Sequence, residues 1–392
     1  MNTVKLGEYG SFRNGLNFSK EESKGKGCKI LGVGDFENKT FIPVDSLDEI
    51  NTDLVTEDDI IQNGDIIFVR SNGNKSLVGR MLLAKGIEER ICYSGFCIRF
   101  RPYNSNNSLN LFYALKSPYC KKQYTPSQQT NITNLSQDKL SEVLIPDFLI
   151  TSSQNKAVNL LSNLDEMIDL NKRLCTELEA MAKTLYDYWF VQFDFPDENG
   201  KPYHTSGGTM EWCQELGREV PKGWKVKRVS ELTKVITGKE DANFSTEDGE
   251  YKFFTCGQDT LHCNTPAFTG KAVLIAGNGD FNVKHYTGSF NAYQRTYVLI
   301  PNEEKYYAAM FIAAKDTIQS FRQGSNGSIV KFITKVDVEK ITLLTPANDY
   351  LLFQLNRIVE QIELFEKEND ELIKLRDWLL PMLMNGQVKV FR

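Results

Sequence analysis

The sequence predicts an α+β fold with two globular α/β domains, related by a pseudo-twofold, that are separated by two long helices forming an antiparallel coiled coil. A helical heptad pattern that occurs twice predicts this fold, as do strand and turn patterns that repeat in the same order in each half. The 392 residues are also too many for one ordinary hydrophobic core. Each half is therefore expected to bury a core of its own.

The two helical segments lie a constant 198 positions apart. Their apolar residues step by four and three, the spacing of the a and d positions of a coiled coil. Each segment has one polar interruption, Asn171 or Asn369, and the two are in register. Because a seam asparagine fixes the register of a helix pair, we expect the segments to pair with each other. The expected seam is Leu160, Leu164, Met167, Asn171, Leu174, Leu178, Met181 and Leu185 with Ile358, Ile362, Phe365, Asn369, Leu372, Arg376, Leu379 and Leu383.

The second copy departs from the first at one seam position. Arg376 stands where the first copy has Leu178, and its neighbour Leu375 is the alternative seam residue. The sequence leaves the register beyond Leu372 open.

The globular parts repeat strand-like runs that end in tight turns. The run from Gly64 to Asn72-Gly73 matches the run from Gly270 to Asn278-Gly279, and Asn-Gly is a strong turn signal. A second strand candidate follows, at residues 96–100 and 296–300. These marks give five segments: a first domain at 1–150, a long helix at 151–195, a turn-rich linker at 196–222, a second domain at 223–350, and a second long helix with its tail at 351–392.

Net charge is −5, which at first argues against a nucleic-acid partner. The whole deficit falls in residues 151–200, whereas residues 66–137 hold ten basic and two acidic side chains. Such a region suits a polyanion, although a solvated basic face is the alternative. The sequence shows no membrane-spanning stretch, signal peptide or paired-cysteine motif, so we expect a cytoplasmic protein with reduced thiols.

No catalytic motif is found, and we expect no catalytic residue, bound cofactor or metal on this chain. What remains are polar and basic loop residues, which suit the reading of base edges, because Arg or Lys pairs with guanine and Asn or Gln with adenine. Ordinary exposed loop residues are the alternative for each of them. The candidate DNA-binding residues are Arg70, Asn72, Asn74, Lys75, Arg80, Gln128, Gln129 and Thr130 in the first half and Asn278, Asp280, Lys284, Gln323, Ser325, Asn326 and Lys331 in the second.

An aromatic run ends the first long helix. More rings are present than one thin helix can cover, so part of the run is a candidate for docking a partner subunit. Packing against the neighbouring domain is the alternative. The docking candidates are Tyr186, Tyr188, Trp189 and Phe190.

The segment from Leu164-Asp-Glu-Met-Ile-Asp-Leu-Asn171 to Trp189-Phe190, the closing run from Leu379 through Gly386, and the two-unit layout resemble the specificity subunit of a Type I restriction-modification system. The resemblance covers the entire chain. It implies two target-recognition domains that read the halves of a bipartite, asymmetric sequence in double-stranded DNA. It also implies partners: two methyltransferase subunits on the helix pair, and restriction subunits with translocase activity in the full host-defence complex. S-adenosylmethionine, ATP and magnesium would be bound by those partners.

Two other readings stay open. One is a coiled-coil adaptor with two duplicated interaction domains that binds proteins and not DNA. The other is an isolated enzyme with an unrecognised site, which turnover by the purified chain would reveal. Salt separates DNA binding from the adaptor, because contacts to phosphates weaken steeply as the salt concentration rises.

Overall fold

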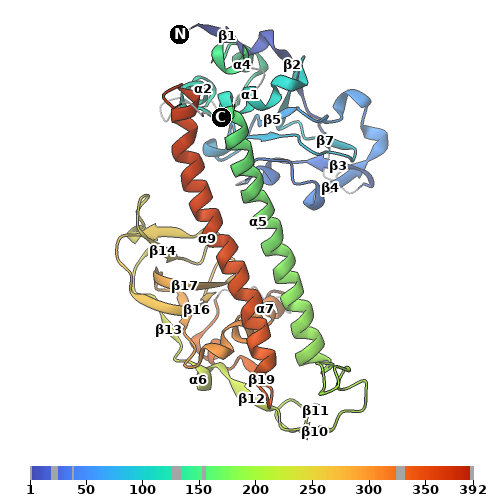
Figure 1. Cartoon of the computed structure of the whole chain (residues 1–392), viewed down its shortest axis with the longest axis vertical. Helices are drawn as coiled ribbons and strands as arrows, with labels where there is room; N and C mark the ends of the chain where they lie inside the picture. The colour runs from blue at the N-terminus through green and yellow to red at the C-terminus, as the bar shows by residue number, and fades with distance from the viewer. Residues whose placement is uncertain are drawn as a thin grey trace. The chain divides into compact units, whose positions relative to one another are not determined.

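The computed structural model describes residues 2–18, 25–37, 39–125, 134–151, 156–323 and 332–388. The chain forms two compact units: the first is Met1–Lys172 with Glu368–Arg392, and the second is Arg173–Lys367. Two long helices, α5 (Lys156–Tyr186) and α9 (Tyr350–Met384), contribute residues to both units and are the green and red helices of Figure 1. The prediction of two mixed α/β units and two long helices is confirmed. Among the described residues, no helix combines the length and apolarity that crossing a membrane requires.

The first unit is built on an antiparallel sheet in the order β2-β8-β5-β6, with smaller sheets β4-β3-β7 and β1-β9. Its central strand β5 reads Ile-Ile-Phe-Val and is buried on both faces: Ile66 and Phe68 pack with α1, whereas Ile67 and Val69 pack with β3 and β7. The strands are β1 (Thr3–Lys5), β2 (Gly10–Asn14), β3 (Gly27–Leu31), β4 (Asp48–Asn51), β5 (Ile66–Val69), β6 (Met81–Leu83), β7 (Ile91–Tyr93), β8 (Cys97–Pro102) and β9 (Leu144–Pro146). The helices are α1 (Ser108–Lys116), α2 (Pro118–Tyr124), α3 (Gln137–Ser141) and α4 (Phe148–Thr151), with short 3₁₀ turns at Leu6–Glu8, Val33–Phe36, Val44–Ser46, Thr52–Leu54, Glu57–Asp59, Lys75–Leu77 and Ser105–Asn107.

The second unit has a larger sheet in the order β13-β18-β16-β17-β14-β15, together with the pairs β12-β19 and β10-β11. The β10-β11 hairpin lies within the segment expected to be a linker. The strands are β10 (Met210–Cys213), β11 (Arg218–Pro221), β12 (Lys225–Arg228), β13 (Ile236–Thr237), β14 (Tyr251–Phe254), β15 (Leu261–Cys263), β16 (Phe268–Ala276), β17 (Val283–Ala292), β18 (Thr296–Leu299) and β19 (Thr342–Thr345). The helices are α6 (Val229–Leu232), α7 (Tyr307–Gln323) and α8 (Lys335–Glu339), with a π-helical turn at Asp187–Val191 and 3₁₀ turns at Ala242–Phe244 and Glu304–Tyr306.

The two units share one strand order, which defines the residues that correspond. The order β2-β8-β5-β6 matches β13-β18-β16-β17, and β4-β3-β7 matches β15-β14-β17. Gly15 and Gly238 are corresponding residues of the two units. Each donates its backbone N–H to the neighbouring strand: Gly15 to the Cys97 carbonyl and Gly238 to the Thr296 carbonyl. A Cβ at either glycine would lie within 2.5 Å of backbone oxygen atoms, which explains why both units have glycine there.

The hydrogen-bonded ladders correct the alignment that was based on the Asn-Gly turns. Val69 pairs with Cys97, and Ala276 pairs with Thr296, so Val69 corresponds to Ala276 and Cys97 to Thr296. The sequence alignment placed both strands one residue away from this match. Because successive strand residues face opposite sides, a one-residue error exchanges the two faces. The turns misled the alignment because the loop after β5 is longer than the turn after β16: Val69 N bonds Arg80 O, whereas Ala276 N bonds Asn282 O.

Within each unit, α5 and α9 pair in antiparallel orientation. In the first unit, Asn171 Nδ2 donates to Glu368 Oε2 at 3.1 Å, and Asn369 Nδ2 donates to the Ile168 carbonyl at 3.3 Å. Both asparagines are buried. In the second unit, Cys175 Sγ contacts the Ile362 carbonyl.

The observed seam differs from the expected one at every second position of α5. Met167 is 45% exposed, whereas Ile168 is 5% exposed. Leu164, Asn171 and Leu178 belong to the seam as predicted, at its d positions, but the residues that alternate with them lie one residue later than expected. Apolar residues occupy both columns, so step counting alone could not separate them. The observed a positions are Leu161, Ile168, Cys175 and Ala182, and the expected Leu160, Met167, Leu174 and Met181 lie at g.

The aromatic run after α5 packs inside the second unit. Tyr186, Trp189 and Phe190 are buried, and the rings of Phe190 and Trp224 lie 5.3 Å apart. Only Tyr188 of the four docking candidates is exposed. The docking assignment of the three buried rings is therefore corrected: they form core contacts, because Trp224 and Phe193 cover them from the following segment.

Candidate nucleic-acid interface

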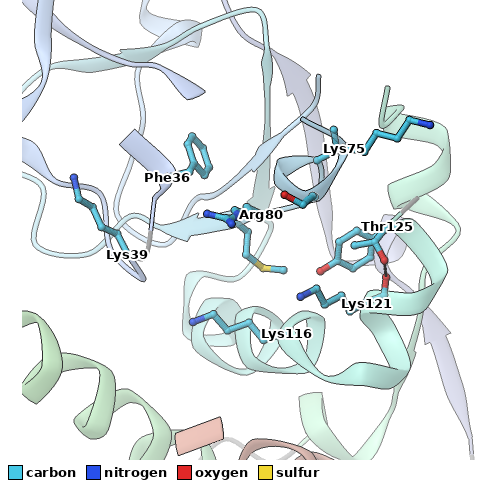
Figure 2. A pocket seen from close by; sticks show the side chains of 12 residues that line it. Phe36, Lys39, Lys75, Arg80, Lys116, Lys121 and Thr125 are labelled. Atoms are coloured by element: carbon cyan, nitrogen blue, oxygen red, sulfur yellow. Dashed lines mark hydrogen bonds between the residues drawn. The ribbon is translucent and has the colours of Figure 1, made fainter. Parts of the chain in front are cut away.

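A basic pocket of about 390 Å³ lies in the first unit, beside the loop that follows β5. It is bounded by that loop, by the start of β6 and by α1 and α2. Figure 2 shows Arg80, Lys116 and Lys121 extending into the same hollow, with Lys39 on its other side and Lys75 directed away from it. The lining residues are Phe36, Lys39, Lys75, Ser76, Val78, Gly79, Arg80, Met81, Lys116, Lys121, Tyr124 and Thr125.

The loop between β5 and β6 is ordered by its own polar side chains. Asn72 Oδ1 accepts from Asn74 N at 2.8 Å, and Asn74 Oδ1 accepts from both the backbone and the hydroxyl of Ser76. These bonds fold the 3₁₀ turn that carries Lys75. The two asparagines, predicted to read bases, thus use their carbonyl oxygens to shape the loop, which leaves their amide N–H groups as donors.

Lys116 is held at the pocket by a buried carboxylate. Its Nζ lies 3.4 Å from Asp165 Oδ2 and 3.1 Å from the Thr40 hydroxyl. Asp165 also accepts 2.7 Å bonds from Tyr113 OH and Arg376 Nη1. Burial alone would raise the pKa of Asp165, but the cations of Lys116 and Arg376 hold it below its ordinary value. This carboxylate therefore stays charged and fixes α1, α5 and α9 around one point.

This ion pair resolves the open question of the second helix. Arg376 lies in the seam against Asp165, while Leu375 is exposed, so no shift of the helix occurs. The second unit has a related arrangement, because Glu363 stands 198 residues after Asp165. Glu363 accepts from Tyr307 OH and lies 3.2 Å from His285 Nδ1. In each unit, a tyrosine hydroxyl thus donates a hydrogen bond to a carboxylate at the corresponding position of a long helix.

Charge counting along the sequence overstated the basic surface, because acidic partners come from distant segments. Arg101 pairs with the buried Asp65 at 2.7 Å. Arg90 pairs with Glu57, and Lys85 with Glu166. Lys116 and Lys121 belong to the basic stretch but were not among the predicted DNA-binding residues, and neither was Lys39. Only the folded chain brings Lys39 to this pocket, so no local pattern marks it.

The other candidates belong to one unit or the other, or fall outside the described residues. Arg70 follows β5 and donates from Nη1 to the Gly95 carbonyl at 3.4 Å. In the second unit, Asn278 and Asp280 lie in the turn between β16 and β17, and Lys284 bonds the Gly257 carbonyl at 2.8 Å. Gln323 ends α7. The candidates Gln128, Gln129, Thr130, Ser325, Asn326 and Lys331 fall outside the residues that the structure describes.

The fold is similar to that of a solved protein, the S subunit of a Type I restriction-modification system from M. genitalium. That crystal structure aligns with 97% of this chain and 95% of its own, with a TM-score of 0.57 at 17% identity, which shows the fold alone. The family model of the Type I restriction modification DNA specificity domain matches residues 1–180 and 221–374. The chain belongs to this family.

Two curated relatives agree with the family assignment. The chain is 35% identical over 177 residues to the EcoDI specificity subunit of Escherichia coli, a match covering 43% of this chain. It is 25% identical over 284 residues to the MjaIX specificity subunit of Methanocaldococcus jannaschii, covering 64% of this chain. These matches span 40% and 62% of the relatives' own lengths.

Proposed function

We propose that this chain is the DNA-specificity subunit of a Type I restriction-modification complex and reads a bipartite, asymmetric target in double-stranded DNA. The observation that carries the proposal is a repeated frame with different side chains at its loop edge. Arg80 of the first unit corresponds to Asn282 of the second, since each carbonyl accepts from the end of the central strand. The two positions differ in chemistry: the first carries a guanidinium, and the second an amide whose Nδ2 donates to the Cys256 and Gly257 carbonyls. One frame with different side chains at this position suits two different half-sites.

In this proposal the chain does no chemistry. Methyl transfer, ATP use and cleavage belong to partner subunits that bind S-adenosylmethionine, ATP and magnesium, and the complex acts on DNA in the cytoplasm. A protein adaptor with two interaction domains remains the competing function. A pocket into which Arg80, Lys121 and the Asp165-bound Lys116 extend favours an anionic target instead.

The experiment that tests this function is a base-resolution map of methylated adenines in a methylation-deficient host. The chain is expressed with the methyltransferase subunit from its own source, beside a control that lacks the chain. A split motif that appears only with the chain supports the proposal. A stable complex without chain-dependent methylation contradicts it.

The exposed g positions of α5 support methyltransferase docking, with one subunit for each unit. Met167 in the first unit and Met181 in the second are each 45% exposed although their helix face is apolar. An apolar column beside an occupied a/d seam is typical of a helix that packs against a further helix. We therefore propose that a helix of one methyltransferase subunit packs along the g positions of α5 in each unit. Restriction subunits then join the larger complex.

Met181→Glu is expected to remove one methyltransferase copy, because it buries an unpaired charge against the partner helix. Native mass spectrometry of the purified complex measures the change from two copies to one. Thr176→Glu, on the opposite flank of the same helix, is the matched control and is expected to keep both. Two copies bound to Met181→Glu would contradict this docking site.

A further inference from the structure

The two units carry matched tight turns beside the end of the central strand. In the first, Gly95 N bonds Leu16 O, and Phe96 O accepts from Arg70 N at 2.7 Å. In the second, Gln294 N bonds Glu240 O, and Arg295 O accepts from Gly277 N at 2.9 Å. Each turn is closed by a 2.8 Å bond from the following residue, Cys97 or Thr296. Phe96 and Arg295 therefore occupy the same position at the tip.

Each tip combines an exposed phenylalanine with an arginine, although the two residues come from different positions. In the first unit, Phe96 is 62% exposed and the Arg70 guanidinium lies on the Gly95 carbonyl of the same turn. In the second, Arg295 is at the tip and Phe332 is 64% exposed. Phe332 precedes Ile333, whose N–H bonds the Gly277 carbonyl at 2.8 Å. Each unit thus has an exposed phenylalanine and an arginine beside its own turn, although the two side chains come from different positions in the two units.

The backbone at Phe96 is held by three hydrogen bonds, which separates its ring from a mobile surface side chain. Phe96 N donates to Ser94 Oγ at 3.1 Å, and its carbonyl accepts from Ser71 N as well as from Arg70 N. A phenyl ring held out in water gains nothing for the fold, whereas phenylalanine wedges between base steps and stacks on bases in protein–DNA complexes. The adjacent arginine can donate two hydrogen bonds to a guanine edge in the major groove. It can instead insert into a narrow minor groove, where the negative potential attracts it.

We infer that Phe96 with Arg70, and Phe332 with Arg295, are base-contacting pairs that set the sequence specificity of the first and second half-sites. In each pair the ring stacks on or wedges beside a base, and the guanidinium contacts a neighbouring base edge. This inference rests on the proposed DNA-reading function and names residues for it that carry no role in the pocket. It assigns one aromatic contact to each half of the target.

The test measures affinity of the methyltransferase complex for its mapped target and for an unrelated duplex of equal length. Phe96→Ala is expected to weaken target binding about 5- to 150-fold, the usual loss for one stacked base, and to leave binding to the unrelated duplex unchanged. Phe96→Trp is expected to keep target binding, because a larger ring still stacks. Phe332→Ala is expected to produce the same loss. With 2-aminopurine in the target, Phe96→Ala changes the emission only in one half-site and Phe332→Ala only in the other.

Tyr103→Ala is the matched control, since Tyr103 is 74% exposed at the opposite end of β8 from Phe96. It is expected to bind like the unchanged complex. Target binding by Phe96→Ala and Phe332→Ala equal to that of Tyr103→Ala would overturn the inference while leaving DNA reading intact. A complex of the unchanged chain that binds target and unrelated duplex equally would instead overturn the proposed function.

Discussion

Asp165→Ala is expected to lower the free energy of unfolding of the first unit by about 3–5 kcal/mol, the usual cost of removing one partner of a buried ion pair. The substitution leaves Lys116 and Arg376 without the carboxylate that they share, and it removes the acceptor of the buried Tyr113 hydroxyl. Urea denaturation of the full chain, followed by a probe in the first unit, measures the change.

Glu166→Ala is the matched control for this result. Glu166 is the next residue of α5 and pairs with Lys85, but both side chains are nearly half exposed. An exposed pair contributes at most about 1 kcal/mol. Equal losses for Asp165→Ala and Glu166→Ala would contradict the anchoring role of Asp165.

Acid provides a second measurement on the same residue. Burial opposes ionisation of Asp165, but Lys116 and Arg376 outweigh it and lower its pKa. A carboxyl with a lowered pKa stabilises the fold above the pKa of an unfolded aspartate, about 3.9, and this contribution is lost as the pH falls through the folded value. The stability difference between the unchanged chain and Asp165→Ala is therefore expected to be constant near neutral pH and to shrink below about pH 4.

The double substitution Arg80→Ala with Lys121→Ala is expected to weaken DNA binding by the methyltransferase complex by about 2–3 kcal/mol, because charge-assisted contacts contribute strongly. Both side chains line the basic pocket and extend into it (Figure 2). If each contacts one phosphate, the slope of log affinity against log salt concentration falls by about 1.8. Titrations at several salt concentrations measure both quantities.

Lys122→Ala is the control, because Lys122 is exposed on α2 beside Lys121 but does not line the pocket. It is expected to change the slope little. A double variant with an unchanged slope would show that DNA does not contact this pocket.

The sequence repeat made the architecture predictable. It did not predict which of two adjacent helix faces is buried. The two helices and the place of Asn171 and Asn369 follow from heptad steps that tolerate small errors. The two mixed units follow from strand and turn patterns that repeat in the same order. The a and g columns of α5 were confused because both are apolar, and burial alone separates Ile168 from Met167.

The site was predictable only in part, because charge partners and pocket walls come from distant segments. Arg80 and Lys75 lie on one loop with turn-forming asparagines, and that local pattern selected them. Lys116 depends on Asp165, 49 residues later, and Lys39 reaches the pocket from another segment. Neither relation leaves a mark in a local window.

If each unit reads its own half-site, exchanging the corresponding residues Arg80 and Asn282 changes the two half-sites separately. Methylated adenines are mapped at base resolution for complexes that carry Arg80→Asn or Asn282→Arg. Arg80→Asn is expected to alter one half of the split motif and Asn282→Arg the other, and the spacer is expected to stay unchanged. A change in the same half-site for both variants, or in both halves together, would contradict two independent readers.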